Sequence, residues 1–183
     1  MVKGYVFFAE GFEEVEALTV VDLMRRAEIK VDMVSITGER TVTGAHGIAV
    51  KMDALLEEIA IEEAEALILP GGMPGTRNLQ KCEQLVSSLV AANKEGKLIC
   101  AICAAPLVLG QNQILAEKKA CCYPGFEEEL LQADVSYEPV CHDGNVITSR
   151  GMGTAIAFAS EIIATLMDAE KAKAIEKGIL YSA

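Results

Sequence analysis

The sequence predicts an α/β domain in which a mostly parallel sheet lies between two layers of helices. Short apolar runs alternate with amphipathic stretches along the chain. These apolar runs are nearly continuous, as expected for strands that are buried on both faces. The chain has 183 residues, of which 51% are hydrophobic. A chain of this length and composition can bury one core, so we expect residues 1–183 to form a single domain.

The first half of the chain begins with a strand at residues 5–9 and an amphipathic helix at residues 14–27. The elements expected to follow are a strand at 31–36, a glycine-containing hairpin at 41–50, an acidic helix at 55–64 and a strand at 66–69.

The second half is expected to contain a helix at 79–93, a strand at 98–102 that leads directly into a helical run at 103–109, strands at 135–137 and 145–149 around an Asp143-Gly144 turn, and closing helices at 154–167 and 169–179. Ligands of such sheets bind at the carboxyl ends of the strands. We therefore expect the functional site in the loops after Ala9, Leu69, Ile102 and Ser149.

Composition excludes several classes of function. The 16 basic and 27 acidic residues give a net charge of −11, which disfavours binding to nucleic acid. No apolar run reaches the length of about 18 residues that spans a bilayer, and Glu10 comes too early for the core of a signal peptide. We expect a cytoplasmic protein with reduced cysteines. A single Cys-x-x-Cys pair and two histidines do not fit a zinc finger, so no metal is predicted.

Cys103 is the strongest candidate for a reactive residue. It follows a β-branched strand and precedes Ala104-Ala105-Pro106 and a helical run, a sharp corner of the kind that lifts a nucleophile above a sheet. The start of the following helix is expected to lower the pKa of its thiol. The alternative is a buried cysteine that acts as a small apolar residue.

Cys100 and Cys103 also form a Cys-x-x-Cys pattern. Because Cys100 falls inside the expected strand, the two Cα atoms would lie about 10 Å apart, beyond the reach of about 7 Å of a disulfide. Dithiol chemistry at this pair is therefore disfavoured. The adjacent Cys121 and Cys122 are either a second redox site or apolar filling of a strand, and filling is the favoured interpretation.

Two further elements adjoin the expected site. Gly71 and Gly72 end the strand at 66–69; they form either a simple tight turn or a turn whose backbone N–H groups stabilise an oxyanion. After the first strand come three acids, Glu13, Glu14 and Glu16. The helix dipole accounts for the first two, whereas a core-facing Glu16 would have a raised pKa and share a proton with a thiolate.

These residues together resemble the ThiJ/PfpI superfamily, and most closely its parkinsonism-associated deglycase branch (DJ-one type). The resemblance runs nearly end to end. It rests on Gly11-Phe12-Glu13-Glu14-Val15-Glu16, Val21-Asp22-Leu23-Met24-Arg25-Arg26-Ala27, Leu69-Pro70-Gly71-Gly72, Ala101-Ile102-Cys103-Ala104, Tyr123-Pro124-Gly125 and Thr148-Ser149-Arg150-Gly151.

The resemblance implies a flavodoxin-like (Rossmann-like) three-layer sandwich that forms a homodimer and needs no cofactor. It assigns Cys103 as nucleophile, Glu16 as its protonated partner, and the N–H groups of Gly72 and Ala104 as the oxyanion hole. Arg26 matches an arginine beside the dimer contact, and His46 matches an anion-binding position supplied by the neighbouring subunit.

Tyr123 occupies a position where some members have a histidine near the nucleophile. Neither His46 nor His142 clearly replaces that histidine, so a Cys-His-acid protease triad is not expected.

Two functions are compatible with Cys103 and Glu16 acting as a pair. The first is a glyoxalase III or protein deglycase type of enzyme, in which Cys103 attacks a reactive dicarbonyl or its glycated adduct and Glu16 moves the protons that convert a 2-oxoaldehyde to a 2-hydroxy acid. The second is an oxidative-stress sensor or protective chaperone-like protein, in which Cys103 is oxidised to sulfinic acid. A role in thiazole metabolism, suggested by the family name, has no visible substrate pocket in the sequence.

Overall fold

In the computed structural model, residues 3–182 are described, and over this range a seven-stranded sheet forms the centre of the molecule in the order β10-β11-β7-β6-β1-β2-β5. Neighbouring strands are parallel except for β10, which runs antiparallel to β11 at one edge. The strands are β1 (Lys3–Phe8), β2 (Lys30–Ser35), β5 (Ala54–Leu55), β6 (Ala66–Leu69), β7 (Leu98–Ile102), β10 (Val140–Asp143) and β11 (Val146–Ser149). The predicted α/β class with a mostly parallel sheet is confirmed.

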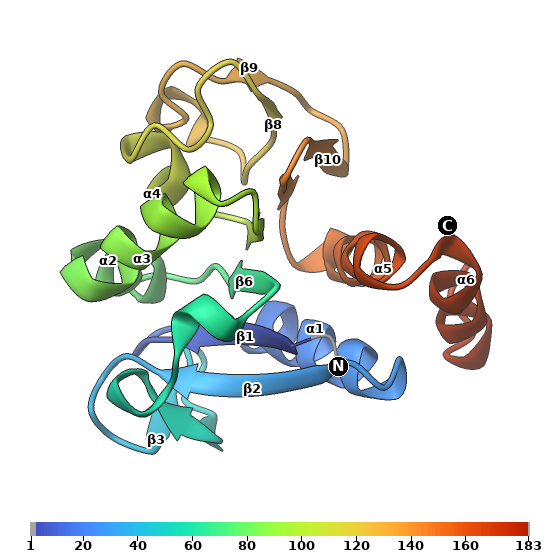
Figure 1. Cartoon of the computed structure of the whole chain (residues 1–183), viewed down its shortest axis with the longest axis horizontal. Helices are drawn as coiled ribbons and strands as arrows, with labels where there is room; N and C mark the ends of the chain where they lie inside the picture. The colour runs from blue at the N-terminus through green and yellow to red at the C-terminus, as the bar shows by residue number, and fades with distance from the viewer. Residues whose placement is uncertain (1–2, 183) are drawn as a thin grey trace.

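Helices cover both faces of the sheet (Figure 1). On one face α1 (Glu14–Arg26) packs beside α5 (Ala155–Leu166), and α6 (Ala169–Gly178) packs on α5. The other face carries α2 (Gly75–Lys81), α3 (Glu83–Lys94) and α4 (Pro106–Gln111). Among residues 3–182, no helix is both long and apolar enough to cross a membrane.

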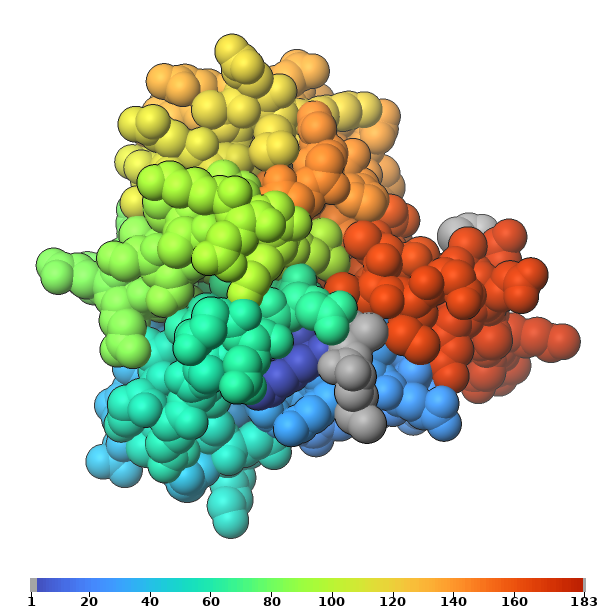
Figure 2. Space-filling model, viewed as in Figure 1, coloured from blue at the N-terminus to red at the C-terminus, as the bar shows by residue number. Residues whose placement is uncertain are grey.

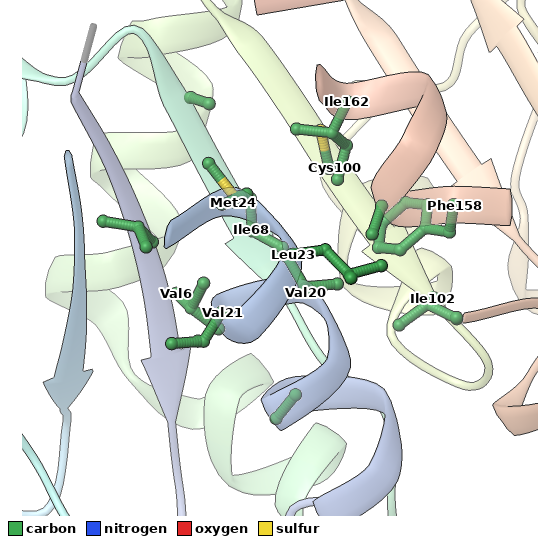
Figure 3. Packing of buried hydrophobic residues seen from close by; sticks show 14 of the residues in the cluster. Val6, Val20, Val21, Leu23, Met24, Ile68, Cys100, Ile102, Phe158 and Ile162 are labelled. Atoms are coloured by element: carbon green, nitrogen blue, oxygen red, sulfur yellow. The ribbon is translucent and has the colours of Figure 1, made fainter. Parts of the chain in front are cut away.

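Alternation along the strands divides the core between these two layers. In β1, Val6 and Phe8 face the layer of α1 and α5, whereas Tyr5 and Phe7 face the opposite layer. Figure 3 shows the first layer, in which side chains of α1 and α5 meet those of β1, β6 and β7. Burial of each such side chain stabilises the folded state by roughly 1.5–3 kcal/mol. Because consecutive residues of a strand face opposite layers and both layers are buried, apolar residues are favoured at consecutive positions.

Two small sheets lie outside the central one. β3 (Thr41–Thr43) and β4 (Ala49–Lys51) form the predicted antiparallel hairpin. β8 (Lys119–Ala120) and β9 (Asp134–Val135) pair in parallel.

The acidic helix predicted at residues 55–64 is wrong. This stretch contains β5 and two single 3-10 turns, Leu56–Glu58 and Ile61–Glu63. The Glu58 carboxylate accepts the N–H of Leu55 and pairs with Arg40, and β5 extends the sheet beside β2. These tertiary contacts outweigh the helical propensity of the acidic residues.

Two other boundaries also differ from the prediction. The helix expected at 79–93 begins earlier and is divided into α2 and α3 at Cys82, whose backbone is extended. The hairpin partner of β11 is β10 rather than residues 135–137, because the two-residue turn at Gly144 and Asn145 pairs Asp143 with Val146. Residues 134–135 instead pair with β8.

Candidate active site

The site lies where the order of the strands reverses. From β1 the chain first adds β2 on one side, and later adds β6 on the other side. Such a reversal separates the loops at the carboxyl ends of the two central strands and leaves a crevice between them. The loops after β1, β6 and β7 meet there, as the sequence predicted.

Cys103 follows β7 and has a left-handed backbone with φ of +65°, a conformation that costs about 1–2 kcal/mol for a residue with a Cβ atom. Both of its backbone groups are held by neighbouring loops. Its N–H donates to the carbonyl of Ser149 at 2.9 Å, and its carbonyl accepts the N–H of Tyr123 at 2.7 Å. The surrounding structure therefore maintains the strained corner that presents the thiol.

Glu16 lies in the first turns of α1 and is only 1% exposed. Its Oε2 accepts the N–H of Gly71 at 3.0 Å. A Cβ atom on Gly71 would lie 2.6 Å from this oxygen and 3.0 Å from the sulfur of Cys103, so the buried carboxyl group and the partly exposed thiol lie on either side of the same glycine.

The two consecutive glycines are required by close packing. A Cβ atom on Gly71 would lie 2.5 Å from the Cβ of Cys103 and 2.6 Å from Oε2 of Glu16. Gly72 has φ of +91°, and a Cβ atom there would lie 2.3 Å from the backbone nitrogen of Glu13. A simple turn would need one glycine, whereas this site has no room for a side chain at either position.

Burial controls the electrostatics of the pair. It raises the pKa of Glu16 to about 7, although hydrogen bonds from Cys103 and Gly71 oppose the shift. Burial, together with the adjacent Glu16 carboxylate, raises the pKa of the Cys103 thiol to about 12, although backbone N–H groups of Gly72 and Ala104 lower it. These are the two N–H groups that the resemblance assigns to the oxyanion hole.

The predicted lowering of the pKa of Cys103 is wrong. The expected helix at 103–109 begins only at Pro106 and is six residues long, so the thiol lies outside its first turn. Burial and the neighbouring carboxylate outweigh the two N–H groups. Of the two groups, the Glu16 carboxyl group has the lower pKa and therefore ionises before the thiol.

The accessory residues named from the resemblance lie in three different places. Arg26 is at the far end of α1 and pairs with Asp22 at 2.7 Å. His46, in the hairpin loop, places its Nδ1 2.8 Å from Glu14 and 3.6 Å from Glu13, so two carboxylates of its own chain already occupy its surroundings. Tyr123 is half-exposed.

The second histidine is also engaged elsewhere. His142 contacts Glu161 and the carbonyl of Gly144, which agrees with the expectation that it does not act at Cys103.

Sequence reasoning missed two features of the site. Gly151 lies between Tyr123 and Glu16: a Cβ atom on it would be 3.2 Å from the ring of Tyr123 and 3.9 Å from Oε1 of Glu16. Glu14 is buried and accepts the backbone N–H of His46 at 2.8 Å. It therefore holds the hairpin loop in place, a role that a favourable interaction with the helix dipole does not predict. The close approach of Gly44 to Glu14 has no signal in the sequence.

Among the described residues 3–182, one group has donor types and spacing that suit a cation. Its members, Glu13, Glu14 and His46, have ligand atoms within 4.8 Å of one another. They already interact with each other, and they do not include Cys103 or Glu16.

The fold and the site together define a class of protein: a three-layer α/β sandwich with a cysteine at a strand-to-helix corner and a buried carboxyl group that lies beside it across a glycine. The model of the DJ-1/PfpI family matches residues 2–165, and the chain belongs to this family.

Its similarity to the DJ-1 branch covers the whole domain. It superposes on the structure of oxidised Toxoplasma gondii DJ-1 with a TM-score of 0.96, at 34% identity and over 100% of both chains. It is 37% identical over 172 residues to Protein DJ-1 homolog B of Arabidopsis thaliana, which covers 93% of this chain, although the chain spans only 39% of the length of that relative. It is also 32% identical over 170 residues to the glutathione-independent glyoxalase DJR-1.2 of Caenorhabditis elegans, which covers 92% of this chain and 90% of the relative.

Proposed function

We propose that this protein is a cofactor-free enzyme that converts 2-oxoaldehydes, or their adducts on amines and thiols, to 2-hydroxy acids. The observation that carries the proposal is that the Glu16 carboxyl group and the Cys103 sulfur lie together beside Gly71, where the N–H groups of Gly72 and Ala104 favour a negative charge on the sulfur. The name of the Caenorhabditis elegans relative supports the same class of reaction.

In the first step the sulfur of Cys103 forms a bond to the aldehyde carbon while its proton passes to the Glu16 carboxylate. The aldehyde oxygen becomes negatively charged, and the N–H groups of Gly72 and Ala104 lie on the side of the sulfur where they would stabilise it. Protonation of this oxygen gives a hemithioacetal. A carboxyl group with a pKa of about 7 is well matched to accept and return a proton near neutral pH.

In the second step Glu16 removes the hydrogen of the former aldehyde carbon as a proton and delivers a proton to the adjacent carbon. The first carbon is thereby oxidised to a thioester and the second is reduced from ketone to alcohol, so no external oxidant or reductant is needed. Water then attacks the thioester, and the 2-hydroxy acid leaves as the thiol of Cys103 regains its proton. The overall change is addition of one water molecule to the 2-oxoaldehyde.

The experiment is lactate formation from methylglyoxal by anaerobic protein without glutathione, corrected for loss in buffer. We expect Cys103→Ser to abolish turnover and Cys82→Ser, at a partly exposed cysteine between α2 and α3, to retain it. Lactate formation by Cys103→Ser at the rate of the unmodified protein would show that the proposed nucleophile is wrong.

A stress-sensing role is the second candidate. Cys103 is partly exposed, and a protonated Glu16 beside it would donate a hydrogen bond to a sulfinate oxygen. The related Toxoplasma gondii structure is described as oxidised. If peroxide converts Cys103 to the sulfinic acid while the anaerobic protein makes no lactate, sensing is the better assignment.

A further inference from the structure

We propose that Cys121 and Cys141 form a dithiol–disulfide couple, a second redox site that a peroxide converts to a disulfide joining the segment after β8 to the edge strand β10. The couple uses neither Cys103 nor Glu16, so it is independent of the function proposed above.

The first argument is the alignment of the two segments. The N–H of Lys119, in β8, donates to the Asp143 carboxylate of β10 at 2.8 Å. Two residues further on, the N–H of Cys121 donates to Thr148, the cross-strand partner of Cys141. The segment from β8 therefore runs antiparallel to β10, and Cys121 lies at the level of Cys141. Residues two apart in an extended chain point to the same side. Figure 1 shows β8 and β10 side by side at one end of the molecule.

The second argument is that both cysteines meet at Thr148 of β11. Cys141 is the direct cross-strand partner of Thr148, so their side chains share one face of the sheet. The hydroxyl of Thr148 accepts the N–H of Cys121 at 2.9 Å, and the sulfur of Cys121 lies 3.6 Å from the same oxygen. A single hydroxyl group therefore marks the place where the two thiols converge.

The third argument is that each thiol lies within the electrostatic influence of the other. Burial raises the pKa of Cys121 to about 12, Thr148 opposes this shift, and the neighbouring Cys141 adds to it. Cys122, next in the chain, is influenced instead by Glu127 and Arg150. Its side chain packs in the core layer of α2, α3 and α4. The pairing is thus with Cys141 and not with the neighbouring cysteine.

Both thiols are buried, with Cys121 at 0% and Cys141 at 2% exposure. β10 is the outermost strand of the sheet and pairs with β11 alone within it, and edge elements open locally more readily than central ones. Figure 2 shows the yellow and orange segments that contain β8 and β10 packed together at the surface of one end. A small peroxide reaches the pair by such opening.

The reaction balances as a two-electron oxidation. One sulfur attacks the peroxide, the O–O bond breaks, and a sulfenic acid and water form. The second sulfur then attacks the sulfenic sulfur, the S–O bond breaks, and a second water leaves with the proton of the second thiol. One peroxide is reduced to two water molecules, and two thiols become one disulfide.

The test treats the folded protein with hydrogen peroxide, blocks the remaining thiols with iodoacetamide during unfolding, and maps peptides by mass spectrometry without reductant. We expect a linked pair of peptides that contain Cys121 and Cys141, with a mass lower by two hydrogens, which dithiothreitol separates. The linked pair should be absent from Cys121→Ser and Cys141→Ser and present in Cys122→Ser, the matched control at an equally buried neighbouring cysteine. It should also form in Cys103→Ser.

Thermal unfolding provides a second readout. If the native arrangement accommodates the bond, the oxidised protein should melt at a higher temperature than the reduced protein, by several degrees, and Cys141→Ser should show no such increase. A link from Cys121 to any other cysteine, reduced thiols at both positions after Cys103 is fully oxidised, or a lower melting temperature of the bridged protein would each overturn the proposal.

Discussion

Burial of Glu16 gives its carboxyl group a pKa that suits proton transfer, but it lowers the free energy of unfolding at neutral pH. A carboxyl group at 1% exposure loses most of its hydration, and the single backbone N–H of Gly71 does not replace it. The proton is therefore held up to a pH of about 7, which is the property that a proton shuttle near neutral pH requires.

The first prediction at this scale concerns turnover. Glu16→Gln preserves size and a hydrogen-bond donor but cannot accept the thiol proton, so we expect dicarbonyl turnover to fall by about 10²-fold or more. Because the carboxylate is the active form of the base, kcat/KM of the unmodified protein should rise with pH through about 7, and the residual activity of the variant should lack this rise. Initial rates from pH 5 to 9 measure both. Near-normal turnover by Glu16→Gln would reduce Glu16 to a structural acid.

The second prediction concerns stability. The folded protein holds the Glu16 proton with a pKa of about 7, against an ordinary value of 4.5. Between these pH values the folded state binds a proton that the unfolded chain has released, so the free energy of unfolding falls as pH rises through this range. Glu16→Gln removes this loss, and its stability relative to the unmodified protein should increase by about 3 kcal/mol between pH 4 and pH 8.

Urea unfolding at several pH values tests this second prediction. Glu170→Gln is a matched control, because it replaces an exposed acid in the first turn of α6. A constant difference in stability between Glu16→Gln and the unmodified protein would contradict the raised pKa of Glu16.

Loops that follow the strands, rather than the strands themselves, hold the reacting groups at fixed positions. The loop after β6 has to pass between Glu16 and Cys103, which excludes a side chain at Gly71. The carbonyl of Ser149, at the end of β11, accepts the N–H of Cys103 at 2.9 Å, and the loop that follows brings Gly151 against Tyr123.

We therefore expect Gly71→Ala to separate the pair. Its Cβ atom would come within 2.6 Å of both Cys103 and Glu16, and such overpacking costs about 1–3 kcal/mol. Turnover should fall at least tenfold, and the melting temperature should decrease. Gly153→Ala is the control, since a Cβ atom there would meet nothing within 4 Å. Equal behaviour of the two variants in both assays would show that the loop tolerates a side chain beside the sulfur.

At the scale of the whole molecule, one group of exposed apolar residues is a candidate association surface. Val15, Ile48 and Met152 are each about half exposed and line one shallow hollow together with His46. Large apolar residues grouped in this way mark association surfaces, and the resemblance implies a homodimer. We propose that a second copy covers this hollow.

Light scattering at micromolar concentration tests this proposal. The mass should be twice the chain mass of 19.6 kDa, and Ile48→Lys should shift it toward the monomer. Leu180→Lys, at an apolar residue that is 91% exposed elsewhere on the surface, should remain dimeric. A monomeric unmodified protein would exclude the proposed association.

Local pattern was sufficient for much of this protein. Nearly continuous apolar runs identified β1, β6 and β7, because strands buried on both faces favour apolar residues at consecutive positions. Shorter apolar stretches identified β2 and β11, which also contain polar residues. The position of Cys103 directly after such a run indicated the corner, and the paired glycines indicated a close approach of the backbone. The sequence predicts these features because each of them depends on residues that are neighbours in the chain.

Tertiary structure decided the properties that depend on distant neighbours. Residues 55–64 have helical propensity but extend the sheet, because Arg40 and β2 offer better contacts. The raised pKa of the Cys103 thiol depends on burial and on a carboxylate 87 positions earlier in the chain, and the proposed pairing of Cys121 with Cys141 depends on the position of β8 beside β10. Burial and long-range pairing are created by folding, so no local pattern in the sequence contains them.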